Sequence, residues 1–158
     1  MSRIEAMLDD ALFTITTARE IDAMLDQWPN VLISGLTGSG KTSITKQWAE
    51  DKGILLAPYD LSYDVTKVYA EDKGGILRPE PAEDPVSVAK KLIFDTLISY
   101  KDRGDFILFL DDYHRATKEN LEAVFYTMDT HNIVNPETGE EVHLDNLLFA
   151  VAIETIGV

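Results

Sequence analysis

The residues best suited to chemistry form one glycine-rich stretch in the first third of the chain. In order they are Gly35, Leu36, Thr37, Gly38, Ser39, Gly40, Lys41 and Thr42, with Ser43 directly after them. Their spacing is G-x-x-x-x-G-K-T, in which small residues let consecutive backbone N–H groups turn toward one anion. Lys41 can reach the terminal phosphates of a polyphosphate, and Thr42 can offer its hydroxyl to a magnesium ion. A plain glycine turn has no use for Gly-Lys-Thr at its end, so we predict that this stretch binds phosphate.

The segments on either side of this stretch must position it. The apolar run 31–34 suits a buried strand, and residues 43–49 suit a helix that we expect to end at Gly53. A strand, a glycine loop and a helix in this order place the loop at the electropositive start of the helix. This context favours a phosphate site over a turn without a ligand.

A second group of candidate residues lies further along the chain. Asp111 and Asp112 follow residues 106–110, which are apolar at every position. Such a run predicts a strand buried on both faces of a parallel sheet, and ligands of these sheets bind beyond the carboxyl ends of the strands. Asp111 can hold a magnesium ion on the side of Thr42, and Asp112 can orient an attacking water. The alternative is that both aspartates only cap the next helix.

The composition limits the class of protein. The 158 residues are 45% hydrophobic and include no cysteine, which predicts one globular domain without disulfides or thiolate metal sites. The net charge of −14 disfavours binding to nucleic acid or to an anionic membrane over most of the surface. The first residues do not have the pattern of a secretion signal, and the apolar runs are too short to cross a bilayer. We therefore expect a soluble, cytoplasmic protein.

Apolar runs alternate with helical patterns, which predicts an α/β fold. We expect a mostly parallel sheet with helices on both faces, built on strands near 31–34, 54–58, 106–110 and 147–153. Residues 1–28 have the spacing of two helices, and residues 29–158 would form the core that holds the phosphate site. The whole chain, 1–158, is predicted to be a single domain.

Other patterns predict the elements between these strands. Asp84 before Pro85 is a strong helix start, and Thr117 is predicted to cap a second helix. We expect the second helix to bury one face, made of Leu121, Val124, Phe125 and Met128. Residues 131–144 suit a hairpin whose His131 and His143 are interpreted as surface residues, because a third metal ligand is lacking in the pattern. Residues 60–83 show no sustained period and are predicted to form a long, partly mobile loop, which is either functional or a solvated insertion.

These motifs resemble those of a known family. The stretch 35–42 resembles a Walker A loop, residues 106–112 resemble a Walker B strand, and together they are similar to AAA+ ATPases of the P-loop NTPase class. The continuation Asp111-Asp112-Tyr113-His114-Arg115-Ala116 is most similar to the MoxR-related and dynein-related branch, in which D-E-x-x-R-A leads to a helix and a hairpin. The resemblance covers about residues 18–156 and implies ATP and Mg²⁺ as ligands, a homo-oligomeric ring, and a macromolecular partner on which the ring acts.

The resemblance also implies roles for single residues. Lys41 and Thr42 would bind phosphate and magnesium, and Asp111 would hold the magnesium. Asp112 would occupy the position of the catalytic glutamate of the family. The polar sensor at the end of the fourth strand, commonly asparagine, would fall near Glu154 or Thr155.

Three departures from the family pattern affect the expected activity. Asp112 is one methylene shorter than glutamate, and Glu154 places a negative charge where the family has a neutral donor. The sequence ends before the fifth strand, the arginine finger and the helical lid of the family, so we expect a fragment of a larger ring-forming ATPase that hydrolyses ATP slowly by itself. One alternative is a nucleotide-gated binding switch with little hydrolysis. A small-molecule kinase or a GTPase built on the same loop is another, although the N-K-x-D element of a GTPase is missing.

Overall fold

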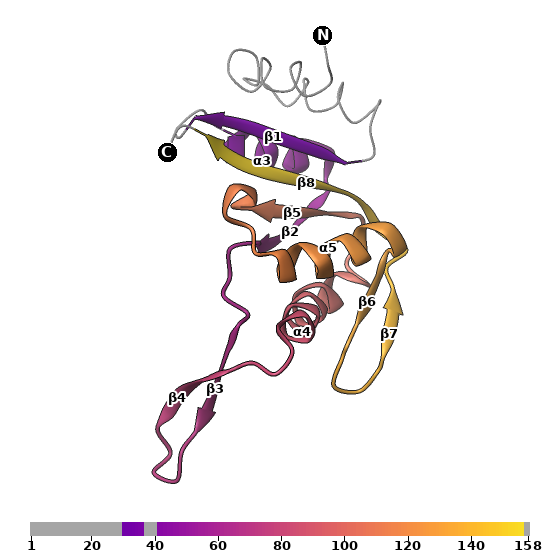
Figure 1. Cartoon of the computed structure of the whole chain (residues 1–158). Helices are drawn as coiled ribbons and strands as arrows, with labels where there is room; N and C mark the ends of the chain where they lie inside the picture. Colours follow the sequence, from indigo (N-terminus) through magenta and orange to yellow (C-terminus); the bar gives the residue numbers. More distant parts are fainter. Residues whose placement is uncertain (1–29, 37–40, 157–158) are drawn as a thin grey trace.

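A four-stranded parallel sheet forms the centre of the molecule (Figure 1). The computed structural model describes residues 30–36 and 41–156; the two helices predicted within residues 1–28 lie outside these ranges. The strands are β1 (Val31–Leu36), β2 (Leu55–Asp60), β5 (Phe106–Asp111) and β8 (Leu147–Ile156), in the order β1-β8-β5-β2. The α/β class and the four predicted strands are confirmed, with each strand ending two or three residues later than predicted or, for β5, one residue later.

Strand β5 is buried on both faces, as its apolar sequence predicts. Phe106, Leu108 and Leu110 pack into the core on one face of the sheet, and Ile107 and Phe109 pack into a second core on the other face. Both neighbours of β5, which are β2 and β8, run parallel to it. A strand in this position reads as continuously apolar because neither face meets water.

Helices cover both faces of the sheet (Figure 1). Helix α3 (Lys41–Lys52) packs on one face through Trp48 and Ala49. It ends at Gly53, which has a φ of +68° that glycine adopts without steric cost, as predicted. Helices α4 (Pro85–Leu97) and α5 (Lys118–Thr130) pack on the opposite face. In the part of the chain that the structure describes, no helix is long and apolar enough to cross a membrane.

Both predicted helix caps are confirmed. The Asp84 carboxylate accepts hydrogen bonds from the backbone N–H and the hydroxyl of Ser87, which holds the pKa of Asp84 below its usual value. The Thr117 hydroxyl accepts a hydrogen bond from the backbone N–H of Asn120 at 3.3 Å. The predicted inner face of α5 is partly wrong, because Phe125 is exposed and Asn120 is buried instead. The helical period alone does not decide whether Ala123 or Phe125 lies beside Val124 on the inner face, and in the structure Ala123 is the buried one. The inner position one turn before Val124 is occupied by Asn120, a polar residue whose hydrogen-bond partners lie inside the protein.

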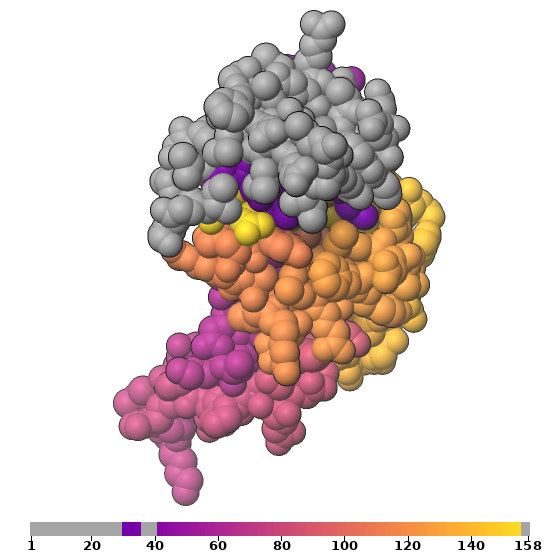
Figure 2. Space-filling model, turned by 45° about the horizontal axis from the view of Figure 1, so that its top comes forward, coloured from indigo at the N-terminus to yellow at the C-terminus, as the bar shows by residue number. Residues whose placement is uncertain are grey.

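Residues 60–83 are not an irregular loop, which corrects the prediction. They contain a two-stranded antiparallel hairpin of β3 (Lys67–Glu71) and β4 (Leu77–Pro81), which projects from the body of the protein (Figures 1 and 2). Neither strand buries every second residue against a core, because nearly all of their side chains are exposed. The sequence therefore lacks the period-two pattern of a half-buried strand. Pro79 and Pro81 further disguise β4 as a loop.

Two 3₁₀ turns and a second hairpin complete the described fold. A 3₁₀ turn, η2 (Ile98–Tyr100), follows α4, and a second one, η3 (Tyr113–Arg115), follows β5. The predicted hairpin near the end of the chain is confirmed as β6 (Asn132–Val134) and β7 (Glu141–His143). The rings of His131 and His143 stack with centroids 6.5 Å apart.

A buried side-chain amide joins α5 to the segment that follows β2. Asn120 is fully buried; its Oδ1 accepts a hydrogen bond from the Tyr59 hydroxyl at 2.6 Å. Its Nδ2 donates to the backbone carbonyls of Leu61 and Tyr63, at 3.1 and 2.8 Å. Burial, with Asp60 nearby, raises the pKa of Tyr59, which keeps the phenol protonated as the donor of this network. Helix α5 is therefore fixed to the chain segment beside the end of β5, where Leu61 N–H donates to Asp111 O.

We predict that Asn120→Ala lowers the free energy of unfolding by about 3 kcal/mol, because it leaves the buried Tyr59 hydroxyl without an acceptor and removes one hydrogen bond each from the Leu61 and Tyr63 carbonyls. Urea denaturation followed by circular dichroism measures this loss. Asn132→Ala is the matched control, since Asn132 makes its side-chain hydrogen bonds at the surface, and it should cost about 1 kcal/mol or less. Equal losses for the two variants would contradict the structural importance of the network.

Candidate functional site

The predicted site residues gather at the carboxyl edge of the sheet. Strand β1 ends with Gly35 and Leu36, and Gly35 lies beside Thr155 of β8. On the other side of β8, Asp111 ends β5. Leu110 of β5 pairs with Ala152 of β8. Strand β8 continues to Ile156, so its last residues extend beyond the end of β5. The chain therefore brings together, at one edge, residues that are up to 120 positions apart, such as Ser34 and Glu154.

Lys41 is the first residue of α3 and is almost completely buried, with 6% of its surface exposed. Its Nζ donates a hydrogen bond to the backbone carbonyl of Gly35, near the end of β1, at 2.9 Å. Burial lowers the pKa of the Lys41 ammonium, because the charged form loses hydration. An ammonium group held in this way is an effective partner for a bound anion.

The start of α3 is held by side chain to backbone contacts. The Thr45 hydroxyl donates to the Lys41 carbonyl at 2.8 Å and is fully buried. Thr42 is half-buried in the first turn of α3, and Ser43 is exposed beside it. Leu36 is the last residue of β1, whereas Thr37, Gly38, Ser39 and Gly40 lie outside the described residues. Their predicted role in binding phosphate remains a prediction.

The two aspartates after β5 have different backbone conformations. Asp111 is the exposed last residue of the strand, and its Oδ1 accepts a hydrogen bond from the backbone N–H of Asp112 at 2.9 Å. Asp112 has a φ of 54° and a ψ of 43°, the left-handed helical region that aspartate adopts at a cost. This sharp turn ends β5 and directs the chain into η3. Strained backbone of this kind is often found at functional sites.

Glu154 lies on β8 beside Ser34 of β1, and the Ser34 hydroxyl donates to Glu154 Oε2 at 3.4 Å. The sequence did not mark Ser34 as a site residue. Ser34 is buried, and the hydrogen bond from its hydroxyl stabilises the negative charge of the Glu154 carboxylate. Glu154 and the two aspartates make this edge acidic, so Lys41 is the oppositely charged group that an anionic ligand requires here.

His114 is the functional candidate that sequence reasoning missed. It lies on η3 with 18% of its side chain exposed, and its Nδ1 accepts a hydrogen bond from the backbone N–H of Thr155 at 3.2 Å. Its Nε2 is 3.9 Å from Asp112 Oδ1. The signal available in the sequence was position: His114 comes two residues after Asp112, at the edge where β8 also ends.

The donor set fits a hard cation bound together with a ligand rather than alone. Within the described ranges no group of three or more His, Asp or Glu residues is arranged to hold a metal ion. Thr42 and Asp111 offer a hydroxyl and an exposed carboxylate, and oxygen donors of this kind suit Mg²⁺. Magnesium commonly takes one or two protein oxygens and completes its shell with phosphate oxygens and water. The residues present therefore fit magnesium that arrives with a polyphosphate.

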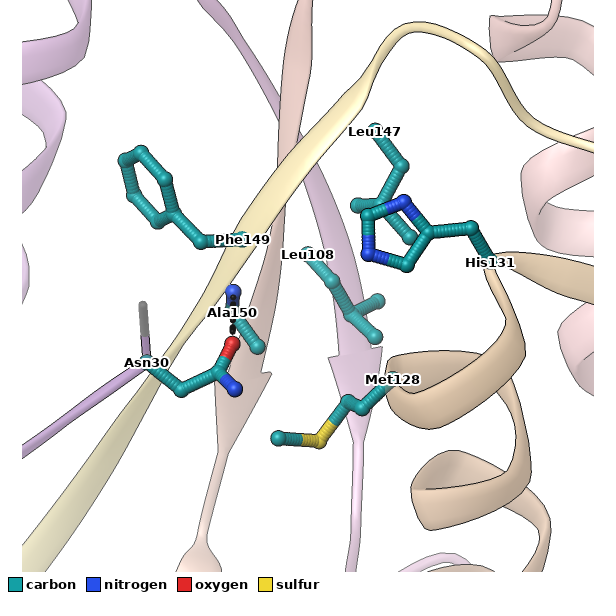
Figure 3. Close-up of a pocket in the computed structure, with 7 residues that line it drawn as sticks. All are labelled: Asn30, Leu108, Met128, His131, Leu147, Phe149 and Ala150. Atoms are coloured by element: carbon teal, nitrogen blue, oxygen red, sulfur yellow. Dashed lines mark hydrogen bonds between the residues drawn. The ribbon is translucent and has the colours of Figure 1, made fainter. Parts of the chain in front are cut away.

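A separate small pocket lies toward the other end of β8 (Figure 3). Asn30, just before β1, accepts a hydrogen bond from the backbone N–H of Ala150 at 2.9 Å, and Leu147, Phe149 and His131 line the same space. The volume is about 10 Å³, which is room for one water molecule. This pocket is too small for an organic ligand, and it does not compete with the carboxyl edge as a candidate site.

Comparison with known proteins finds similarity among solved structures. No family model and no curated protein matches the sequence. Among solved structures, the chain is similar to a "putative ATPase" from Cytophaga hutchinsonii ATCC 33406, determined at 2.00 Å resolution. The TM-score is 0.48 and 14% of the aligned residues are identical. The match covers 98% of this chain and 44% of that protein, so this chain spans less than half of its length.

We predict that Asp112→Gly is more stable than Asp112→Ala by about 1 kcal/mol, because glycine adopts positive φ without the clash that alanine meets. The free energies of unfolding of both variants in urea measure this difference. The matched pair is Asp111→Gly and Asp111→Ala, one residue earlier in β5, where glycine should be the less stable by roughly 0.5–1 kcal/mol. The same order at both positions would contradict the left-handed conformation of Asp112.

Proposed function

We propose that this chain binds ATP with Mg²⁺ at the carboxyl edge of its sheet and hydrolyses it, as the core of an AAA+ ATPase. The observation that carries the proposal is the placement of Lys41. Its ammonium is buried at the first residue of α3, directly after β1 and the glycine-rich segment, and it is held on the Gly35 carbonyl. The G-x-x-x-x-G-K-T spacing and the strand and helix that flank it support a polyphosphate as the ligand.

The proposed binding step exchanges one partner of Lys41 for a stronger one. In the described structure the ammonium meets a neutral carbonyl oxygen. A phosphate oxygen would carry a negative charge, so the ammonium would gain a Coulombic attraction beyond the hydrogen bond that a neutral carbonyl accepts. The burial that lowers the Lys41 pKa also strengthens this attraction, because little water screens it. Thr42 and the N–H groups at the start of α3 would bind the same anion.

Asp111 and Thr42 would hold the magnesium ion. When bound, magnesium neutralises charge on the terminal phosphates and so supplies electrostatic stabilisation. The Asp111 carboxylate is exposed at the edge of the sheet, and one of its oxygens already accepts the Asp112 N–H. The other oxygen is the one we assign to the metal.

Asp112 would orient the attacking water, and Glu154 would stand near the polar sensor position toward the end of β8. A carboxylate that accepts a hydrogen bond from water orients it for in-line attack on the terminal phosphorus. The Asp112 side chain is short, so its strained backbone turn would have to bring it nearer to the phosphate. Glu154 adds negative charge close by, which would slow hydrolysis. We therefore propose weak turnover for the chain by itself.

We also propose a macromolecular partner and assembly into a homo-oligomeric ring. The projecting hairpin of β3 and β4 supports a protein partner, since Tyr69, Ile76 and Leu77 on it are each about 60% exposed or more. Apolar side chains on a projecting element are typical of a contact surface. The acidic composition favours a protein over a nucleic acid as that partner.

We predict that Lys41→Ala weakens ATP binding on the order of 100-fold, because one charge-assisted contact to phosphate is lost. Isothermal titration calorimetry with ATP and MgCl₂ measures the affinity, and circular dichroism checks the fold. Lys46→Ala is the control: Lys46 is exposed on the same helix and should bind ATP as the wild type does. Equal affinities of the Lys41 variant and the wild type would remove Lys41 from the site.

We predict that Asp111→Asn raises the magnesium concentration needed for half-maximal ATP binding by about tenfold, because a neutral amide is a weaker ligand than a carboxylate. Titration of MgCl₂ at fixed ATP, read by a fluorescent ATP analogue, measures the shift. Asp145→Asn serves as the control, since Asp145 has a side chain that is almost fully exposed near β7. A shift of the same size in both variants would point to bulk charge instead of a metal ligand.

A further inference from the structure

We infer that His114 is a positioning residue that ties the Asp112 carboxylate to the end of β8. This inference rests on the proposed function, in which Asp112 orients the attacking water. His114 touches neither the proposed phosphate site nor the proposed metal ligands through any contact described above. It acts through Asp112 on one side and through the backbone of Thr155 on the other.

The contact with Thr155 fixes the chemical state of the ring. Because the Thr155 N–H donates to Nδ1, that nitrogen must carry a lone pair. In a neutral imidazole the proton is then on Nε2, the nitrogen that lies toward Asp112. The backbone of β8 thus selects the tautomer that presents an N–H donor to the carboxylate.

The contact with Asp112 is set at a distance that a small movement closes. Nε2 and Asp112 Oδ1 are 3.9 Å apart, which is about 1 Å longer than a good hydrogen bond. The ring itself is held by η3, which packs against β8, and by the Thr155 hydrogen bond. The carboxylate is the more mobile partner, since 37% of the Asp112 side chain is exposed. A side-chain rotation of Asp112 toward Nε2 would complete the bridge.

A hydrogen bond from His114 Nε2 to Asp112 would give the two carboxylate oxygens of Asp112 different roles in the reaction. A donor on Oδ1 holds the carboxylate in one orientation and leaves Oδ2 for the water. Catalytic groups lose much of their effect when they are misplaced by about 1 Å. The bridge also joins Asp112 to the strand end that carries Glu154 and Thr155, so a shift of β8 on nucleotide binding would move the Asp112 carboxylate with it.

Three substitutions separate the two contacts of His114. His114→Ala removes both. His114→Asn keeps an acceptor near the position of Nδ1 but does not reach Asp112, whereas His114→Gln can place an N–H donor near the position of Nε2. His143→Ala is the matched control, because His143 is an exposed histidine on β7. Asp112→Asn sets the rate that remains without the carboxylate.

Two readouts are measured on the full chain. Amide hydrogen exchange at Thr155, followed by NMR, reports the hydrogen bond to Nδ1. ATP hydrolysis at increasing ATP with MgCl₂ gives kcat and KM. We expect His114→Ala to lose Thr155 protection and about tenfold in kcat with KM changed less than twofold. His114→Asn should restore Thr155 protection but not kcat, and His114→Gln should restore part of kcat.

Each opposing result overturns a distinct step. Unchanged Thr155 exchange in His114→Ala means that the hydrogen bond to β8 is wrong. Full kcat in His114→Ala or in His114→Asn means that the link to Asp112 has no part in positioning. A wild-type rate equal to that of Asp112→Asn overturns hydrolysis at this site, and the positioning role with it. A fall in kcat for His143→Ala as large as for His114→Ala would show a general effect of losing a histidine.

Discussion

Strand β5 has to satisfy every one of its backbone groups inside the protein, because helices cover both of its faces. Parallel pairing with β2 on one side and β8 on the other meets this requirement. Those two strands in turn place their own carboxyl ends at the edge where β5 ends. The position of Asp111 and Asp112 relative to Glu154 is therefore a consequence of how the most deeply buried strand is paired.

The charges at this edge are uneven, and that imbalance bears on function. Three carboxylates, those of Asp111, Asp112 and Glu154, end two neighbouring strands, while the Lys41 ammonium is buried at the start of the adjacent helix. Like charges in one place are costly unless cations or hydrogen-bond donors compensate for them. The hydroxyl of Ser34 and the backbone N–H of Asp112 already provide part of this compensation. A polyphosphate alone would add negative charge to this edge, whereas a magnesium ion bound with it would bring a cation to the Asp111 carboxylate, which is why the proposed ligand is a metal complex.

The sequence predicted those parts of the fold whose local pattern and burial agree. The apolar run of β5, the caps at Asp84 and Thr117 and the glycine at the end of α3 are confirmed, because each depends on residues within a few positions of one another. The hairpin of β3 and β4 was missed because it lies away from the core, so burial imposes no pattern on it. Phe125 was wrongly placed on the inner face of α5, and the burial of Asn120 was not predicted, because a buried hydrogen-bond network overrode the preference for an apolar inner face.

The candidate site follows the same division. Lys41 and Thr42 could be proposed from the spacing of one continuous motif, and Asp111 could be proposed from its place directly after an apolar run. His114 could not, since its partner Thr155 is 41 positions away and the link involves a backbone N–H that has no sequence signature. Ser34 was missed for a similar reason: its partner Glu154 comes beside it only through the pairing of β1 with β8.

The two prolines of β4 have a consequence for how the projecting hairpin behaves in solution. Pro79 and Pro81 pair with Tyr69 and Lys67, and neither proline has a backbone N–H to donate. The outer margin of β4 is thus deprived of two of the groups that an incoming strand from another molecule would need. Along the β4 margin the hairpin is therefore a poor template for edge-to-edge pairing, and recognition at that margin depends on side chains such as Leu77 rather than on the backbone.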